Sequence, residues 1–420
     1  MSINIILSAL ANQVKLILCM MDVTMRLISM RIAYFTDTFL PRIDGITYTV
    51  SEHSKLLSAR GNKIRIYAPS YPERNKNEKL NGVMIERYPS IPLPTYKGTR
   101  ISFPNIYTIY KSIKKFNPDI IHFHTPGPIG ISAILLARFL KKPLVTTYHT
   151  LWSEVLPPLP PFNIIYKFFK TDETEKDLFK NAIWKISGEF FDDCDVIISP
   201  AKTIMRQLLI HNHKGKIVVV SNGIDTNKFK AKVRAKTNLK ILYVGRLSHE
   251  KNVDMVIKAF AKVVRRISDA KMEIVGDGPV LKSLKNLVDK LKLSNQIVFH
   301  GSIDREKLVN YYKGCDVFAT GSAMEVQPLT LLEAMSCGLP VVGVKRAGVA
   351  EMVINDVNGY LVSPSNSNAM STKIVKILSD NKLRLKLGKN SRKTAKENSL
   401  LSSIQKLENL YKQTTRTHWG

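Results

Sequence analysis

The chain has 420 residues, 44% of them hydrophobic, so it is long and apolar enough to bury the cores of two or three domains. This composition argues against a disordered chain. Its 63 lysines and arginines outnumber its 34 aspartates and glutamates and give a formal net charge of +29. Such a charge favours anionic partners, whether nucleic acid, anionic lipid or phosphorylated substrates, and does not distinguish them.

The four cysteines lie far apart in the sequence, without the close spacing of zinc ligands or of a disulfide framework (Cys19, Cys194, Cys315 and Cys337). We therefore expect a reducing, cytoplasmic environment. The basic residues recur in short clusters that lack the aromatic platforms and reading motifs of nucleic-acid-binding proteins. A nucleic-acid partner is accordingly not expected, and an anionic membrane surface is the alternative to simple solvation of these clusters.

Residues 1–29 form a leader with two possible interpretations. Polar and charged residues interrupt it before it reaches the roughly 18 apolar residues of a spanning helix, so we expect no transmembrane anchor. The leader is apolar enough to lie on a membrane. However, Met21, Met25 and Met30 are alternative starts, and we favour the interpretation that the start codon is misassigned and the folded protein begins near Met30.

From Arg31 the sequence alternates between short apolar runs and amphipathic segments. RIAYFTD, a helix-like TYTVSEHSKLLSAR closed by Gly61, and KIRIYAP together predict a βαβ unit. The runs DIIHFH, LVTTYH, VIISP and IVVVSNG continue the series, with ISAILLARFLKK as a further helix. This alternation predicts a first domain over residues 30–222, with a parallel sheet covered by helices on both faces.

A polar and basic stretch at residues 223–239 predicts a linker. A second alternating series follows at 240–397, with strand candidates that include KILYVGR, MEIVGDG, QIVFHG, DVFATG and PVVGV. Residues 398–420 are expected to form a helix that returns to the first domain. The predicted fold is α/β, with two Rossmann-like doubly wound domains facing across a cleft, and ligands should bind beyond the carboxyl ends of the strands.

The segment GSAMEVQPLTLLEAMSCGLPVVG carries the strongest functional pattern. Glu325 precedes a predicted helix and Glu333 lies inside it, eight positions later. Carboxylates at these places can accept hydrogen bonds from hydroxyl groups on different parts of one nucleotide sugar.

The start of the same helix should bind an anion. Pro328 suits the first helical position and Gly338 the residue just beyond the helix. The backbone N–H groups of Leu329 and Thr330 would then lack helical acceptors and could bind a diphosphate.

A second pattern is VGRLSHEKNVDMVIKAF, in which Arg246 ends a predicted strand and Lys251 lies near the start of the next helix. Two cations beside a helix N-terminus can clamp a diphosphate and stabilise the charge that develops on a leaving phosphate. Either residue on its own would be interpreted as an ordinary surface cation of a basic protein.

These patterns together resemble family-4 glycosyltransferases of GT-B fold, from Met30 to about Lys396. The family's Glu-x₇-Glu motif corresponds to Glu325 and Glu333, its basic pair to Arg246 and Lys251, and its N-terminal glycine loop to PRIDGITYTV with Gly45. The resemblance implies that Glu325 binds the hydroxyls of the donor sugar and that Glu333 binds the ribose. It also implies retention of anomeric configuration, with a nucleotide sugar as co-substrate and neither a further cofactor nor a catalytic metal.

Two weaker correspondences complete the expected site. TYHT resembles the family's active-site histidine loop, so the resemblance places His149 beside the sugar and the acceptor; a structural histidine is the alternative. QIVFHGSID resembles the turn that meets the nucleotide base, near Gly301, although an ordinary strand-to-helix turn fits nearly as well. The chain also departs from the family at Pro328 and at Ala347, two positions where glycine is common.

Other motifs are weaker. GDGPVL lacks the third glycine of a dinucleotide-binding loop, which disfavours NAD. His122 and His124 share one strand face, where structural or substrate-lining roles are favoured over metal binding. Asp193 and Asp195 spell DxD, which we interpret as a helix-strand connection. The chain has neither a GxSxG elbow nor a GxxxxGK[ST] loop, which weakens hydrolase and kinase alternatives.

The acceptor is expected to be a membrane lipid. The chain resembles the branch of the family that includes diacylglycerol glucosyltransferases and phosphatidylinositol mannosyltransferases, which implies transfer of glucose or mannose at the inner face of the cell membrane. LWSEVLPPLPPFNIIYKFFK mixes aromatic and basic residues as a membrane-facing segment would, although a helix covering the core fits equally well. A soluble or polysaccharide acceptor, a basic nucleic-acid-binding protein and a noncatalytic sugar-nucleotide-binding protein are the alternatives.

Overall fold

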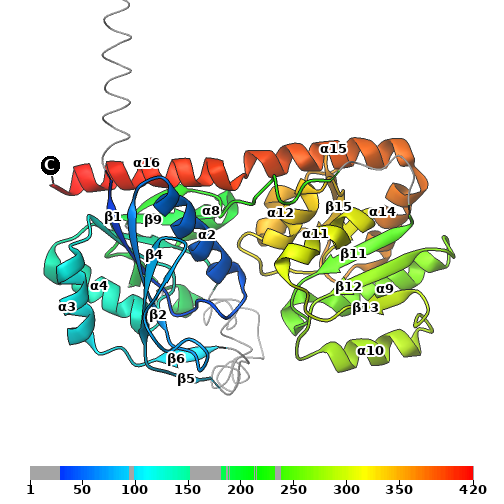
Figure 1. The fold of residues 1–420 in the computed structure, drawn as a ribbon. Helices are drawn as coiled ribbons and strands as arrows, with labels where there is room; N and C mark the ends of the chain where they lie inside the picture. The colour runs from blue at the N-terminus through cyan, green and yellow to red at the C-terminus, as the bar shows by residue number, and fades with distance from the viewer. Residues whose placement is uncertain are drawn as a thin grey trace, which may run out of the picture.

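The computed structural model describes residues 29–93, 99–151, 181–185, 188, 190–211, 213, 215–231 and 238–419. Two α/β domains lie side by side, and a long C-terminal helix extends from the second back over the first (Figure 1). The predicted two-domain α/β architecture is confirmed. The leader and the aromatic segment around residues 152–170 lie outside the described residues.

The first domain contains an eight-stranded sheet in the order β10-β9-β8-β7-β1-β2-β4-β3. All neighbouring pairs are parallel except β3 with β4. Its strands are β1 (Arg31–Phe35), β2 (Lys63–Pro69), β3 (Glu78–Leu80), β4 (Val83–Tyr88), β7 (Ile120–Phe123), β8 (Leu144–Thr147), β9 (Val196–Ser199) and β10 (Lys216–Val219).

Helices cover both faces of this sheet because its central strands are apolar on both sides. Along β1, Ile32 and Tyr34 belong to one buried cluster, and Ala33 and Phe35 belong to another on the opposite face. Helices α2 (Gly45–Ala59) and α16 (Leu400–Trp419) cover the first cluster, and α3 (Ile106–Phe116), α4 (Pro128–Leu140) and α8 (Lys202–Ile210) cover the second. A small hairpin of β5 (Ser90–Pro92) and β6 (Arg100–Ser102) precedes α3.

Local sequence signals set the limits of α2. The Asp44 side chain caps its start by accepting a hydrogen bond of 2.8 Å from the backbone N–H of Thr47. Gly61 follows its last turn with a φ of 93°, a left-handed conformation that suits glycine, as predicted.

The second domain has a six-stranded parallel sheet in the order β13-β12-β11-β14-β15-β16. Its strands are β11 (Lys240–Val244), β12 (Lys271–Val275), β13 (Ile297–Phe299), β14 (Val317–Ala319), β15 (Val341–Val344) and β16 (Gly359–Val362). Its helices are α9 (Val253–Val264), α10 (Leu281–Lys290), α11 (Arg305–Gly314), α12 (Leu329–Ser336), α13 (Ala347–Met352), α14 (Ser367–Ser379) and α15 (Asn381–Glu397).

The connections between the domains are not purely polar. Ile224 and Phe229, in the stretch expected as a linker, are fully buried in a core cluster of the second domain. In the other direction, α16 packs on the first domain, where the Tyr411 and Tyr34 hydroxyl oxygens lie 3.0 Å apart and Glu408 pairs with Arg60. The two domains therefore share both a connecting segment and a returning helix.

Candidate active site

The two motif-bearing loops of the second domain are joined to each other. One loop follows β11 and carries Arg246 and Lys251, and the other follows β14 and carries Glu325. Lys251 Nζ forms an ion pair with Glu325 Oε1. Asn252 Nδ2 donates a hydrogen bond of 3.1 Å to the carbonyl of Gly321. The sequence patterns that contain these residues thus meet at one edge of the sheet.

The loop around Arg246 is fixed through its backbone. The Tyr243 hydroxyl donates a hydrogen bond of 3.0 Å to the carbonyl oxygen of Arg246, and the backbone N–H of Leu247 donates to Asp277 O at 3.0 Å. Both Arg246 and Lys251 remain half-buried, within reach of solvent. A preorganised loop with two accessible cations suits an anionic ligand.

The backbone of Glu325 rests on Gly348. The N–H of Gly348 donates to the carbonyl of Glu325 at 2.8 Å, and a Cβ on Gly348 would lie 2.2 Å from the carbonyl oxygen of Val326. Glycine is therefore required there by close approach. The neighbouring Ala347 has a φ of 42°, so this departure from the family pattern places an ordinary side chain in the left-handed region.

Helix α12 begins one residue later than predicted. Pro328 is its N-cap in an extended conformation and Leu329 is the first helical residue, so the expectation of Pro328 at the first helical position is wrong by one residue. The proline ring fixes φ at −73°, while ψ is 108°, outside the helical region. Leu329 and Thr330 still occupy the first turn, where N–H groups lack helical acceptors.

The glycine loop of the first domain reaches this helix. A Cβ on Gly45 would lie 3.8 Å from the Cδ1 atom of Leu329, so the start of α2 contacts the start of α12. Gly338, at the other end of α12, has a φ of 79° and follows the helix as predicted. The starts of α2 and α12 therefore lie close to each other at the domain interface.

Glu333 lies in a different setting from Glu325. Its side chain is fully buried, accepts a hydrogen bond of 2.7 Å from the Tyr312 hydroxyl and pairs with Arg305. Burial raises the pKa of Glu333, and the Arg305 guanidinium opposes this shift. Glu333 is thus already engaged by protein groups, while the Glu325 side chain is 27% exposed.

Arg305 connects Glu333 to the first domain. The Arg305 guanidinium carbon lies 3.5 Å from the centre of the Tyr48 ring, a cation–π contact across the interface. Neither residue could be identified from the sequence, because Arg305 lies among charged residues at a helix start and Tyr48 lies inside an amphipathic helix.

A second bridge crosses the interface beside Glu325. The Gln327 side chain accepts a hydrogen bond of 2.7 Å from the backbone N–H of Asn222 and donates one of 2.9 Å to Ser221 Oγ. His53 Nε2 lies 2.8 Å from the carbonyl oxygen of Asn222. Helix α2, the connecting segment and the Glu325 loop are therefore coupled through Asn222.

His149 belongs to a histidine row in the first domain. Its Nε2 lies 3.1 Å from His124 Nδ1, and the His124 ring stacks on His122 at a centroid distance of 4.1 Å. Burial lowers the pKa of His149 to about 3, so its imidazole is neutral at physiological pH. His122 bonds to Tyr411 at 2.5 Å and to Thr147 at 2.9 Å, which identifies it as a structural residue.

The residues of the remaining motifs make hydrogen bonds and ion pairs within the protein. Gly301 has a φ of 68° and its carbonyl accepts a hydrogen bond of 2.8 Å from Gly276, in the GDGP segment. Asp193 pairs with Arg138, and Asp195 accepts a hydrogen bond of 2.7 Å from the Leu144 N–H, so DxD is a helix-strand connection. Within the described residues, no group of three or more potential ligands is arranged to hold a metal ion.

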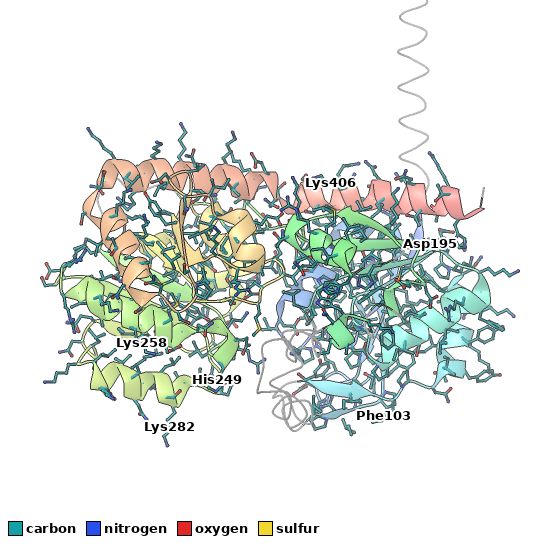
Figure 2. The ribbon with its side chains drawn as sticks, turned by 180° about the vertical axis from the view of Figure 1, so that it is seen from behind. Phe103, Asp195, His249, Lys258, Lys282 and Lys406 are labelled. Atoms are coloured by element: carbon teal, nitrogen blue, oxygen red, sulfur yellow. The ribbon has the colours of Figure 1, made fainter. Side chains whose placement is uncertain are left out.

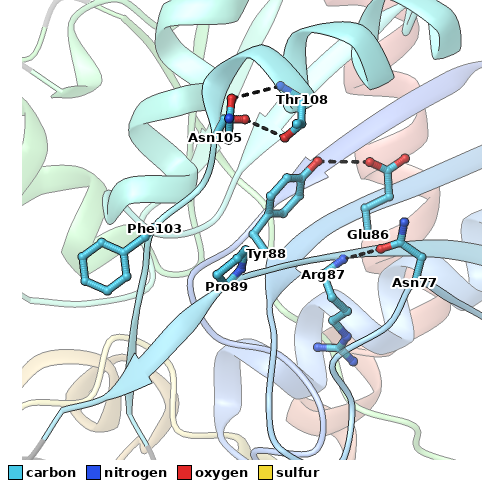
Figure 3. A pocket seen from close by; sticks show the side chains of 8 residues that line it. All are labelled: Asn77, Glu86, Arg87, Tyr88, Pro89, Phe103, Asn105 and Thr108. Atoms are coloured by element: carbon cyan, nitrogen blue, oxygen red, sulfur yellow. Dashed lines mark hydrogen bonds between the residues drawn. The ribbon is translucent and has the colours of Figure 1, made fainter.

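A surface hollow of about 450 Å³ lies elsewhere, between β4, β6 and the start of α3 (Figure 3). Its polar groups bond to each other: the Tyr88 hydroxyl donates to Glu86 at 3.1 Å, and the Thr108 N–H donates to Asn105 at 3.3 Å. None of the predicted site residues lines it, so the candidate site remains the interface between the two domains.

The comparisons with known proteins agree with this geometry. The family model for Glycosyltransferase Family 4 matches residues 43–228, and the model for Glycosyl transferases group 1 matches residues 224–394. Together the two matches span both domains. The chain is a two-domain enzyme of the glycosyltransferase class with the GT-B fold, as the sequence resemblance implied.

Two relatives are similar to this chain over most of its length. Alpha-monoglucosyldiacylglycerol synthase from Streptococcus pneumoniae is 29% identical over 74% of this chain and 70% of its own length. The enzyme of the same name from Acholeplasma laidlawii is 27% identical over 74% of this chain and 80% of its own length. Among solved structures, Anabaena HepE in complex with UDP superposes with a TM-score of 0.72 and 17% identity over 91% of this chain and all of its own.

The chain therefore belongs to the group 1 and family 4 glycosyltransferases and transfers a hexose from a nucleotide sugar. Among the described residues, no helix is both long and apolar enough to cross a membrane.

Proposed function

We propose that this protein is a retaining glycosyltransferase that moves glucose or mannose from a nucleoside diphosphate sugar to a hydroxyl group of a membrane lipid. The single observation that carries the proposal is the Lys251–Glu325 ion pair beside the start of α12. It places a cation for a diphosphate next to a carboxylate for sugar hydroxyls. The two relatives named as monoglucosyldiacylglycerol synthases support the lipid acceptor.

Arg246, Lys251 and the N–H groups of Leu329 and Thr330 bind the donor diphosphate and stabilise the charge on the departing phosphate. Glu325 holds the sugar hydroxyls, and the Lys251 ammonium group keeps its carboxylate in place until the donor arrives. Gly45 allows the backbone of the first domain to approach the phosphates. The departing phosphate accepts the acceptor's proton on the same face of the sugar, and neither a metal ion nor a further cofactor takes part.

The remaining expected contacts involve Glu333, Gly301 and His149. Glu333 binds the donor ribose only after Arg305 releases one oxygen of the Glu333 carboxylate, and Arg305 is itself held by the Tyr48 ring of the first domain. Gly301 contacts the base through its backbone. His149, neutral because burial lowers its pKa to about 3, offers a ring nitrogen to the sugar or to the acceptor and carries no charge. Nucleic acid is not a partner in this scheme.

The test measures nucleotide release and glycolipid formation with UDP- and GDP-hexoses, using mixed lipid vesicles as acceptor. Glu325→Ala should lower the rate by about 10² or more, since it removes both a sugar ligand and the partner of Lys251. Asp254→Ala is the matched control, because it breaks an exposed Lys258–Asp254 pair on α9 and leaves the site intact. NMR of the product's anomeric centre then reports retention or inversion.

Each outcome tests a different part of the proposal. Nucleotide release without a lipid product discards the lipid acceptor and favours a soluble or polysaccharide one. A product of inverted configuration discards retention. If no donor binds or turns over, the proposed site is wrong.

A further inference from the structure

The outer side of the first domain presents apolar and basic side chains together. The helices α3 and α4 expose large apolar residues, with Tyr107 at 59% and Phe139 at 72% of their possible surface. We define the α3–α4 face by six residues: Tyr107, Lys111, Lys114, Lys115, Leu135 and Phe139.

Helical spacing places these side chains on one surface. Tyr107, Lys111 and Lys114 follow each other at four and three positions, while Ile109 and Ile113 point into the core. The Phe139 ring meets Tyr110 edge-on at a centroid distance of 5.7 Å, which joins α4 to α3. The face is thus continuous across both helices.

The lysines of this face have no acidic partners. Among the described residues, none of the three lysines on α3 forms an ion pair, and Lys111 and Lys114 instead lie over the Tyr107 and Tyr110 rings at 4.4 and 5.6 Å. Two aspartates of the described residues that lie near these helices already pair with arginines, Asp119 with Arg31 and Asp193 with Arg138 of α4. The face therefore carries a net positive charge that attracts anions.

We propose that the α3–α4 face is the surface by which this enzyme docks on an anionic lipid bilayer. Exposed lysines meet lipid phosphates, and Tyr107, Leu135 and Phe139 enter the boundary between headgroups and acyl chains, the pattern of an interfacial helix. Lysines beside the Tyr107 and Phe139 rings would serve a nucleic acid as well, but the exposed aliphatic side chain of Leu135 suits acyl chains and offers nothing to a base. The α15 helix is more basic than α3 but exposes no large hydrophobic residue, so it lacks this combination.

The position of the face fits this role. Helix α3 lies on the side of the first domain remote from the second (Figures 1 and 2). Exposed Ile91 and Ile101 of the β5–β6 hairpin, and Phe103 after it, extend the apolar surface from α3 toward the lower side of the domain, where Figure 2 labels Phe103. Docking through the first domain leaves the second domain free to move over its donor.

The inference rests on the proposed function, since a lipid acceptor requires the enzyme to meet a bilayer. Flotation of the full chain with vesicles tests it without any donor or turnover. The vesicles are made of phosphatidylcholine alone or of phosphatidylcholine mixed equally with phosphatidylglycerol, at low and high salt. We expect binding to the mixed vesicles only, weakened by salt.

Two variants of the face and one control sharpen the test. Replacing Lys111, Lys114 and Lys115 by glutamine should lower vesicle partitioning about a hundredfold, at roughly fivefold per lysine. Phe139→Ser should lower it about tenfold through lost apolar burial. The control replaces Lys282, Lys285 and Lys290 by glutamine on α10, a helix of the second domain with the same number of lysines, where Figure 2 labels Lys282, and should change nothing.

Three results would overturn the proposal: wild-type protein that ignores anionic vesicles, equal losses in the α3 and α10 variants, or an α3 variant that loses binding to oligonucleotides while keeping binding to vesicles. Nucleotide release measured on the same proteins without vesicles keeps this outcome separate from the glycosyltransferase proposal. An α3 variant that still hydrolyses the donor but no longer floats supports both.

Discussion

Replacing Arg305 by alanine should destabilise the second domain in a pH-dependent way. The variant leaves the fully buried Glu333 carboxylate without its guanidinium partner. Removing one member of a buried ion pair costs about 3–5 kcal/mol, and the 21% exposure of the Arg305 side chain places this case near the lower end, at about 3 kcal/mol. For a domain of this size the thermal midpoint should fall by roughly 6–12 °C.

The sign of the pH dependence follows from the raised pKa of Glu333. The ordinary pKa of this carboxyl group is 4.5, and folding raises it. The group therefore destabilises the folded state increasingly as the pH rises from 4.5 through the raised pKa. Loss of Arg305 raises the pKa of Glu333 further. The destabilisation should therefore be small below pH 4.5, where the carboxyl is protonated in both states, and largest near neutral and alkaline pH.

Calorimetry of the wild type and the variant at acidic and at mildly alkaline pH measures this effect. Arg305→Lys keeps the charge and should restore part of the lost stability. In a Glu333→Gln background, Arg305→Ala should cost only about 1 kcal/mol, the value of its contact with the Tyr48 ring. Equal destabilisation in both backgrounds, or at every pH, would refute the coupling between Arg305 and Glu333.

Three further outcomes are expected. Burial lowers the pKa values of four histidines in the first domain, His53, His122, His124 and His149, so the unfolded state binds more protons below pH 6.5. The stability of this domain should therefore fall by up to about 5 kcal/mol per pH unit as the pH drops, and a flat profile in denaturant titrations would contradict this. Glu351 accepts hydrogen bonds from the N–H groups of Lys202 and Thr203 at 2.9 and 2.7 Å, so Glu351→Ala should cost about 1 kcal/mol and speed hydrogen exchange at the start of α8, whereas unchanged exchange would show that the cap is dispensable. Gly348→Ala should displace the loop that carries Glu325 and lower nucleotide release about 10²-fold, while Gly314→Ala, whose Cβ would meet no atom within 4 Å, should leave it unchanged.

The sequence predicted the parts of the molecule that depend on local pattern. The recurring short apolar runs predict both sheets, because strands that are buried on two faces are apolar along their whole length. The loops after β11 and β14 follow the strands that the sequence indicated, and Lys251 meets Glu325 there. Glycines after helix ends, such as Gly61 and Gly338, are predictable because glycine adopts the left-handed backbone of these positions without a Cβ clash.

Contacts between segments far apart in the chain could not be predicted from the sequence. Tyr48 and Arg305 are brought together by the relative placement of two domains, which no local periodicity encodes. The sequence shows the lysines of α3 as a basic cluster. That Phe139 lies beside this cluster depends on how α3 packs against α4, which the sequence does not show. The start of α12 was misplaced by one residue because proline fits both the N-cap and the first helical position.

The returning helix α16 has a consequence for the order in which the protein forms during synthesis. Leu400, Ile404, Leu407 and Tyr411 complete a core cluster whose other members begin at Met30, so this cluster can close only after the chain has left the ribosome as far as Tyr411. The second domain, whose two core clusters lie between residues 224 and 395, needs no part of that helix. The domain synthesised first should therefore be the last to finish folding, and until then its apolar face is exposed to chaperones and to aggregation.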